Sequence, residues 1–551
     1  MTTEKQLQIK TLSSLTKVFP ERICGRVSKA CDAARGQEVA FQVAYRLPMK
    51  KYYQKEFTVK AEAPEGIALS LYTVGLVPSV LASYPDRRDP NYITHLGGIF
   101  PDPLFPMEGD TVKAAVGVWR TVWVSLRIPT DAKEGVYPVK VTFFNQDGET
   151  VAKTTYRVTV HSAVLPAQRL LYTQWFHCDC IADVHGVPVM SEAHWTLMEK
   201  YMQLAAAHGM NMILTPVVTP PLDTAVGTER PTVQLVGIEK TGDTYSFDCS
   251  LLGRFVSMAR SAGIEHFEIS HLFTQWGVAH APKVVATVDG REQKIFGWET
   301  DAASEEYKAF LKAFVPAVIA YMKSLGVPED HIWFHVSDEP HMEHLEAYRT
   351  AHSILTPLIE GCHHMDALSD LSFYQEGLLP SPVVATNRIE PYLEANVEGL
   401  WCYYCCSQGV DVSNRFFSMP SPRTRIIGVQ LYKYRIEGFL QWGYNFYYTQ
   451  LSKRLVNPYT ETDAGEAFPS GDAFTVYPYR DGVIPSLRQK VFANALEDLR
   501  LLELLEEKLG RARVLEELER IAGMEITFKS YPTDEGFFEA LYRFAFEMLE
   551  Q

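Results

Sequence analysis

The stretch His331-Ile332-Trp333-Phe334-His335-Val336-Ser337-Asp338-Glu339-Pro340 decides the fold. Residues 331–337 are apolar and aromatic, and they predict a short buried strand. Asp338 and Glu339 follow, and Pro340 ends the strand because proline has no amide N–H to donate. A helical pattern begins near Met342. A strand, an acidic pair, a proline and a helix are typical of a βα unit of an α/β barrel whose strand end carries chemistry.

An acidic pair in a loop is also typical of a solvated turn or a helix N-cap. A Trp and a His just inside the strand, and similar strand ends before and after it, favour a functional role. Seven more segments resemble this strand, and helical patterns separate most of them. The eight predicted strands are 170–178, 210–216, 266–273, 331–337, 363–368, 382–386, 400–406 and 438–447. Eight strands alternating with connections predict a (β/α)8 barrel.

The first 165 residues have a different pattern, with short alternating segments, turn residues and no convincing helix. Asp147-Gly148 between two such segments is a hairpin signal. We therefore expect an N-terminal antiparallel β-sandwich at 1–165, a catalytic barrel at 166–500 and a helical extension at 501–551.

Composition limits the possible partners and cellular locations. The chain has 551 residues and a net charge of −15, which argues against nucleic acid and anionic membrane surfaces as partners. No apolar run is long enough to span a bilayer. The N-terminus lacks the apolar core of a signal peptide, so a cytoplasmic protein is expected, or a secreted or periplasmic one if a leader was removed. Nine cysteines without a disulfide framework or zinc spacing predict free thiols.

In a barrel the strand ends meet at one mouth, where carboxylates and aromatic faces suit a sugar. The residues expected there are Trp175, His177 and Asp179 on the first strand, His335, Asp338 and Glu339 on the fourth, Asp366 and Asp370 near the fifth, Asn387 on the sixth, Trp401, Tyr403 and Tyr404 on the seventh, and Trp442 and Asn445 on the eighth. No metal or cofactor is expected, and the predicted partner is a glycan or glycoconjugate. The sequence does not predict the oligomeric state.

Glycoside cleavage usually needs two carboxylates on opposite faces of the sugar. Asp338 and Glu339 are adjacent, so both approach from one side, and the ends of the seventh and eighth strands show no carboxylate. A 2-acetamido group on the substrate can replace the missing nucleophile by attacking its own anomeric carbon. Asp338 would then orient the acetamide and stabilise the oxazolinium charge, while Glu339 would act as general acid and base.

Several longer motifs carry a family resemblance. They are 34–42 (ARGQEVAFQ), 174–179 (QWFHCD), 336–340 (VSDEP), 414–416 (NRF), 438–445 (GFLQWGYN) and 470–478 (SGDAFTVYP). With these motifs the chain resembles glycoside hydrolase family 123, the β-N-acetylgalactosaminidases, with its associated DUF4091 domain. The resemblance implies a β-sandwich before a (β/α)8 barrel, retaining substrate-assisted hydrolysis, and Asp338 and Glu339 as the paired acids. Asn414 joins the expected substrate-binding residues through the matching motif.

Three alternatives remain open at this point. One is a retaining glycosidase with a protein nucleophile, Asp366 or Asp370. Another is a carbohydrate-binding protein that does not catalyse. The third is a metal-dependent hydrolase, whose ligands would be His177, Asp179, Asp338 and His363 or His364; the His-x-His common on the first strand of such barrels is absent.

Overall fold

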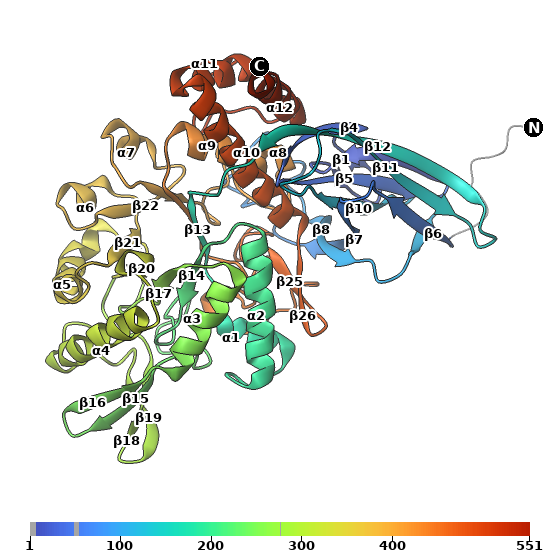
Figure 1. The fold of residues 1–551 in the computed structure, drawn as a ribbon. Helices are drawn as coiled ribbons and strands as arrows, with labels where there is room; N and C mark the ends of the chain where they lie inside the picture. The colour runs from blue at the N-terminus through green and yellow to red at the C-terminus, as the bar shows by residue number, and fades with distance from the viewer. Residues whose placement is uncertain (1–6, 49–53, 276) are drawn as a thin grey trace, which may run out of the picture.

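The computed structural model describes residues 7–48, 54–275 and 277–551 (Figure 1). Every regular element in the described part of residues 7–165 is a strand, and strands alternate with helices after it. The expected change of pattern near residue 165 is therefore confirmed.

The N-terminal region contains two five-stranded sheets. In order across the first sheet, the antiparallel strands are β1 (Gln8–Ser13), β5 (Glu38–Arg46), β10 (Arg120–Arg127), β7 (Ala68–Ser79) and β8 (Gly98–Pro106). The second sheet has the order β4 (Ala30–Arg35), β12 (Thr150–Val164), β11 (Gly135–Phe144), β6 (Gln54–Glu62) and β9 (Thr111–Ala115). A small hairpin of β2 (Lys17–Val18) and β3 (Ile23–Cys24) precedes them.

The two sheets face each other across an apolar core. The rings of Phe41 on β5 and Tyr156 on β12 stack with their centroids 4.2 Å apart. The hairpin predicted at Asp147-Gly148 joins β11 to β12. One pair departs from the antiparallel pattern expected, because β4 runs parallel to β12.

An eight-stranded parallel sheet follows and curves into a nearly closed barrel. Its strands, in sheet order, are β13 (Leu171–Gln174), β24 (Gly438–Gln441), β23 (Trp401–Tyr403), β22 (Ser381–Ala385), β21 (His363–Ala367), β20 (Ile332–Phe334), β17 (His266–Ile269) and β14 (Met212–Thr215). The sheet ends, β13 and β14, lie beside each other: Tyr172 N donates to Asn211 Oδ1 at 2.8 Å, and Asn211 N donates to Tyr172 O at 3.2 Å. All eight expected strands are present in the expected order.

The strands are shorter than the sequence predicted. The fourth was expected over 331–337, but β20 ends at Phe334, and the seventh was expected over 400–406, but β23 ends at Tyr403. The first was expected to reach 178, where helix α1 already begins. The buried residues beyond each strand end follow irregular paths across the carboxyl end of the barrel, and an apolar stretch alone does not distinguish such paths from a strand.

Helices cover the outside of the barrel (Figure 1). In chain order they are α1 (Cys178–His185), α2 (Glu192–Ala207), α3 (Ser250–Ala262), α4 (Glu305–Ser324), α5 (Leu345–Leu355), α6 (Leu371–Gln375), α7 (Glu390–Glu394), α8 (Ser421–Arg425), α9 (Ile427–Lys433) and α10 (Leu487–Leu509), with short 3₁₀ turns η1 (Glu329–His331), η2 (Met342–His344), η3 (Thr356–Leu358) and η4 (Gln450–Ser452). Ser191, Ser304 and Ser486 cap α2, α4 and α10 by accepting backbone N–H bonds.

The long connections lie after the expected strands. The hairpin predicted at Thr241-Gly242-Asp243 is formed by β15 (Gly237–Thr241) and β16 (Thr244–Asp248). It joins β18 (Val284–Val288) and β19 (Arg291–Phe296) in a four-stranded sheet that lies beside α4 at the lower left of Figure 1. A second hairpin, β25 (Val476–Tyr479) with β26 (Gly482–Pro485), follows β24.

The C-terminal helices α11 (Arg511–Ala522) and α12 (Glu535–Glu550) lie beside α10 at the top of Figure 1, and α12 also contacts β12 and β4. Residue 500 lies inside α10, so the boundary expected there falls within a helix. Buried ion pairs join the N-terminal region to the barrel, such as Arg488 with Asp102 at 2.8 Å. None of the described helices combines the length and apolar character that a membrane crossing requires. All nine cysteines are free thiols.

Candidate active site

Asp338 and Glu339 lie in a turn at the carboxyl end of β20, which we call the acid turn (residues 337–340). Both carboxylates are partly exposed, whereas Ser337 and Pro340 beside them are buried. Glu339 has φ 46°, a left-handed conformation that costs a non-glycine residue about 1–3 kcal/mol. Its N–H donates to Ala367 O at 2.9 Å, so β21 holds the turn in place.

Tyr403 connects the acid turn to β23. Its hydroxyl donates to Glu339 Oε1 at 2.6 Å. Burial raises the pKa of Tyr403 well above its usual value, and the charge of Glu339 raises it further, so the phenol remains a donor. The structure therefore brings together three of the expected site residues, Asp338, Glu339 and Tyr403.

Asp366 anchors the chain just before the acid turn. Its carboxylate accepts from Val336 N at 3.1 Å, from Ser337 N at 3.2 Å and from the Tyr348 hydroxyl at 2.6 Å. Burial alone would raise the pKa of Asp366, but hydrogen bonds from His335 and His364 outweigh it and lower the pKa to about 2. Asp366 is thus an ionised, completely buried anchor.

His335 lies between two buried carboxylates. Its Nε2 is 2.7 Å from Glu268 Oε1, and its Nδ1 is 3.2 Å from Asp366 Oδ1. Burial would lower the pKa of His335, but the two carboxylates raise it to about 9. His335 is fully buried, so the structure places it beneath the mouth and away from solvent.

Glu268 on β17 is a site residue that the sequence reasoning missed. It accepts from Trp175 Nε1 at 2.6 Å and from Thr173 Oγ1 at 2.8 Å. The signal in the sequence was a glutamate at the centre of an apolar segment that predicts a buried strand. Trp175, expected to face the sugar, is 3% exposed and holds Glu268 instead.

The environment of Asp338 disfavours its charged form. Burial raises the pKa of Asp338 well above its usual value, and the charge of Glu339 raises it further. The charge of His335 acts in the opposite direction. The pair therefore retains a proton at a pH where an isolated carboxylic acid is fully ionised.

His177 and Asp179 lie near the first strand, but they face another protein group. Arg230 donates to both oxygens of Asp179 at 2.7 Å and to His177 Nδ1 at 3.2 Å, and all three side chains are buried. The side-chain amide of Asn445 accepts from His177 N at 2.9 Å and donates to His177 O at 3.0 Å. His177, Asp179 and Asn445, all expected at the sugar site, therefore belong to a buried structural group. The sequence reasoning missed Arg230, which binds two of them.

Trp442 is partly exposed at the carboxyl end of β24. Its Nε1 donates to Asp472 Oδ2 at 2.9 Å. Asp472 is completely buried, and burial raises its pKa to about 7. The sequence showed no carboxylate at the ends of the seventh and eighth strands, but a later loop brings Asp472 there. Its buried carboxylate is covered by Trp442.

The loop after β23 is held by the two expected asparagines. Asn414 Nδ2 donates to Cys405 O and to Gln408 O, both at 2.9 Å. Asn387 is partly exposed and accepts from Gln408 Nε2 at 3.1 Å. Asn414 is buried and positions the loop, whereas Asn387 remains accessible at the mouth.

Trp401 lies at the first position of β23, inside the barrel. It is 1% exposed and packs against Trp333, with ring centroids 5.2 Å apart. A Cβ on the neighbouring Gly438 would lie about 2.0 Å from the indole, so the glycine makes room for the ring. Trp401 thus belongs to the packed interior of the barrel, because its faces are covered by protein.

One cluster has the residue types and spacing of a metal site. Ligand atoms of His271, His335 and Asp366 all lie within 4.8 Å of one another. Both ring nitrogens of His335 already face carboxylates, so a metal ion would have to displace its proton. Of the ligands expected for a metal-dependent hydrolase, His177 and Asp179 bind Arg230, and His363 stacks on Trp333.

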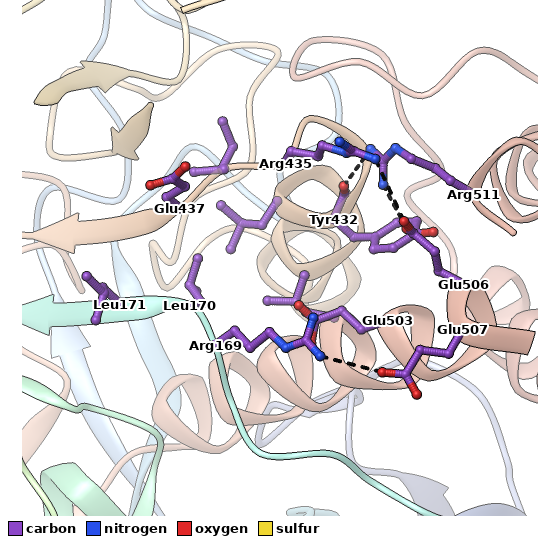
Figure 2. Close-up of a pocket in the computed structure, with 13 residues that line it drawn as sticks. Arg169, Leu170, Leu171, Tyr432, Arg435, Glu437, Glu503, Glu506, Glu507 and Arg511 are labelled. Atoms are coloured by element: carbon purple, nitrogen blue, oxygen red, sulfur yellow. Dashed lines mark hydrogen bonds and ion pairs between the residues drawn. The ribbon is translucent and has the colours of Figure 1, made fainter. Parts of the chain in front are cut away.

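A cavity of about 710 Å³ lies at the other end of the barrel (Figure 2). It is lined by Leu170 and Leu171 at the start of β13 and by Glu437 just before β24. Figure 2 shows an ion pair across its wall between Arg169 and Glu507. Barrel active sites form at the carboxyl ends of the strands, so this cavity is not the candidate active site.

A comparison with solved structures gives a match over nearly the whole chain. A family 123 glycoside hydrolase from Clostridium perfringens, described in connection with glycolipid glycan hydrolysis, has a TM-score of 0.73 and 14% identity, covering 99% of this chain and 98% of that one. A Parabacteroides merdae β-glucuronidase (11% identity, 89% of this chain and 51% of that one) and a Thermotoga petrophila endo-β-1,4-mannanase (13%, 61% and 77%) have TM-scores of 0.31 and 0.34, too low to support an inference.

A comparison with curated protein sequences found no match. The model of the glycoside hydrolase 123 catalytic domain matches residues 175–505. The match spans more than half of the chain and includes the acid turn, Tyr403 and Trp442. The chain therefore belongs to glycoside hydrolase family 123.

Proposed function

We propose that this protein releases terminal β-linked N-acetylhexosamine, most specifically N-acetylgalactosamine, from a glycan or glycoconjugate. The reaction retains the anomeric configuration and passes through an oxazolinium intermediate that the substrate's own 2-acetamido group forms. The catalytic domain is a (β/α)8 barrel that follows a separate N-terminal sandwich.

The observation that carries this proposal is the state of Asp366. A protein nucleophile needs an accessible carboxylate oxygen, but Asp366 is completely buried and accepts from two backbone amides and a phenol. Asp370 accepts from Ser372 N at 3.0 Å and caps α6. Asp472 lies behind Trp442. With these carboxylates occupied, a nucleophile within the substrate is the simpler route.

In this mechanism the two acids of the turn have different tasks. Asp338 orients the acetamide N–H and balances the positive charge of the oxazolinium. Glu339, held by the Tyr403 hydroxyl, protonates the leaving oxygen and later activates water. Burial raises the pKa of Asp338, which favours one proton on the Asp338–Glu339 pair, and general acid catalysis requires that Glu339 holds this proton when the leaving oxygen departs.

Three residues complete the proposed sugar site. Trp442 offers a partly exposed indole for stacking on the C–H face of the sugar. Asn387 and Tyr403 can bind hydroxyl groups at the rim. The fold shared with the Clostridium perfringens enzyme, which is described as acting on glycolipid glycans, supports a glycan as the substrate class.

The test compares aryl glycosides that differ only at C2. We expect turnover of the aryl 2-acetamido glycoside of the correct sugar, and no turnover of the 2-hydroxy analogue, because the latter has no internal nucleophile. A chelator should not reduce the rate, which would separate this mechanism from metal-dependent hydrolysis. Equal turnover of both substrates would instead favour a protein nucleophile, and binding without turnover would favour a carbohydrate-binding protein.

A further inference from the structure

Beneath the acid turn, His335 has a contact on each side that requires a proton. Glu268 on β17 lies 2.7 Å from Nε2, and Asp366 on β21 lies 3.2 Å from Nδ1. An ionised carboxylate can only accept hydrogen bonds, so each ring nitrogen facing one must carry a hydrogen. If both carboxylates are ionised, the imidazole is an imidazolium.

Both carboxylates also accept hydrogen bonds from other donors. Glu268 accepts from the Trp175 indole N–H, which can only donate, and from the Thr173 hydroxyl. Asp366 accepts from the backbone amides of Val336 and Ser337. Hydrogen bonds donated to a carboxylate stabilise its charged form. The geometry therefore assigns a proton to each nitrogen of His335.

A second histidine beside His335 is in the opposite state. His271 stacks on His335 with ring centroids 4.1 Å apart, and the edge of Trp175 contacts its ring. Both nitrogens of His271 are buried without a hydrogen-bond partner in the described structure. Burial and the charge of His335 lower the pKa of His271 well below its usual value. His271 is therefore a neutral imidazole stacked on the charged imidazole of His335.

Glu268 and Asp366 contact this imidazolium directly, its charge acts on Asp338, and Glu339 follows Asp338 in the chain. The proposed mechanism needs one carboxylate of the acid turn ionised and the other protonated. Burial and the charges of Glu339, Asp366 and Glu268 favour the neutral form of Asp338, and the charge of His335 opposes them. Resting on the proposed function, we propose that His335 stays protonated through the neutral range and is the positioning residue whose charge keeps the Asp338–Glu339 pair singly ionised.

The first test needs no substrate. In protein labelled with ¹³C at histidine Cε1, the His335 signal is assigned as the one missing from His335→Gln. We expect it at the position of an imidazolium from pH 6 to 8, about nine-tenths protonated at pH 8 as a pKa near 9 requires. A signal that titrates near pH 6.5 would overturn the inference. So would a signal that equimolar Zn²⁺ shifts, since His335 would then be a metal ligand.

The second test compares His335→Gln with His271→Gln in the full-length protein. Each variant removes one buried imidazole from the same stack, but only the first removes a positive charge. The charge favours ionised carboxyls, so its loss should move both limbs of the kcat/KM pH profile up by about one unit or more. The profile of His271→Gln should keep its limbs, whatever its overall rate.

The outcomes separate this inference from the function it depends on. Equal limb shifts in both variants, or none in either, would mean that His335 acts only by packing, and the inference would fail. A wild-type protein that does not hydrolyse the 2-acetamido glycoside would refute the proposed function and leave the NMR result standing. If His335→Gln does not fold, its signal is assigned through His335→Asn, and the pH dependence of the wild-type signal alone decides the charge.

Discussion

The Tyr403 hydroxyl on β23 lies 2.6 Å from Glu339 Oε1 on the other side of the barrel mouth. This bond fixes one carboxylate oxygen of a residue whose backbone is in the left-handed region. A hydrogen bond of this kind contributes about 0.5–1.5 kcal/mol, enough to favour one orientation of the Glu339 side chain.

Tyr403→Phe should therefore lower kcat by about 10- to 100-fold, because Glu339 loses the contact that aims it at the leaving oxygen. The melting temperature should change little, since the ring packing remains. Steady-state kinetics with an aryl 2-acetamido glycoside and thermal unfolding would measure both. Tyr404→Phe is the matched control, because it removes the hydroxyl of the adjacent residue, which has no hydrogen-bond partner in the described structure. Equal losses in the two variants would contradict the role given to Tyr403.

The paired acids should respond differently to the leaving group. Glu339→Gln should lose most activity toward substrates with poor leaving groups and much less toward activated aryl glycosides, because only the former need full protonation. Asp338→Asn should slow both classes, because it acts on the acetamide.

A thiazoline analogue of the correct sugar should inhibit the wild-type enzyme, since it resembles the cyclised intermediate. The substrate-assisted mechanism would be refuted if a glycosyl group were trapped covalently on Asp370 or another carboxylate while the thiazoline had no effect.

The sequence was sufficient for the order of the eight strands and for the position of the acid turn. Strand order follows from local apolar patterning, and Pro340 marks the end of the buried stretch. The apolar pattern does not predict which side chains from distant parts of the chain bind one another. His177 and Asp179 looked like mouth residues, because nothing local indicates that Arg230, from a long irregular loop, binds both of them.

Trp401 illustrates a second limit. In a strand, alternate residues point into the barrel, but the sequence does not say at which layer each one lies. Trp401 begins β23 and so lies deep inside, whereas Tyr403 ends the same strand and reaches the acid turn. Glu268 and Asp472 were missed because their partners come from other strands and loops.

Trp442 should contribute to substrate binding, and Asp472 should act through it. Trp442→Ala should raise KM strongly, since a stacked aromatic side chain contributes about 1–3 kcal/mol when its area is buried. Asp472→Asn keeps the shape of the side chain but weakens the acceptor of the indole N–H, so it should cause a smaller rise in KM. Steady-state kinetics with an aryl 2-acetamido glycoside would measure both. If Trp442→Ala leaves KM unchanged, the indole is not part of the sugar site.

The Asp179–Arg230 pair should matter for stability. Asp179→Asn leaves a buried guanidinium without its charged partner, which costs about 3–5 kcal/mol of unfolding free energy. The exposed pair of Arg254 with Glu192 is a matched control, because it has similar geometry in solvent, and Glu192→Gln should barely change stability. Urea denaturation measures the difference. If the Asp179→Asn protein were as stable as the wild type but had a raised KM, Asp179 would be a substrate-binding residue, as the sequence predicted.

The buried neutral histidines should each contribute less to stability as the pH drops below about 6.5. His177 Nε2 donates to Trp442 O at 3.0 Å, and Nδ1 accepts from Arg230, so the folded protein holds the neutral ring. Burial and the charge of Arg230 lower the pKa of His177 to about 3, and burial lowers those of His208 and His266 to about 4. In the unfolded chain these rings protonate near pH 6.5.

The unfolded state therefore binds more protons than the folded state below pH 6.5, so the stability given by each neutral ring is complete above that pH and is lost as the pH falls toward the folded pKa. His335 has the opposite sign, because its pKa is raised to about 9: its contribution is complete below about pH 6.5 and is lost as the pH rises from there through 9. Buried acids with a raised pKa, such as Asp472, titrate in the same range with the opposite sign, so the histidines are tested by a difference between two proteins. Relative to the wild type, the urea midpoint of His208→Gln should rise as the pH falls from 7 to 5.5, because the variant has no ring at this position that protonates only on unfolding. A difference that stays constant over this range would show that His208 is not held neutral in the folded protein.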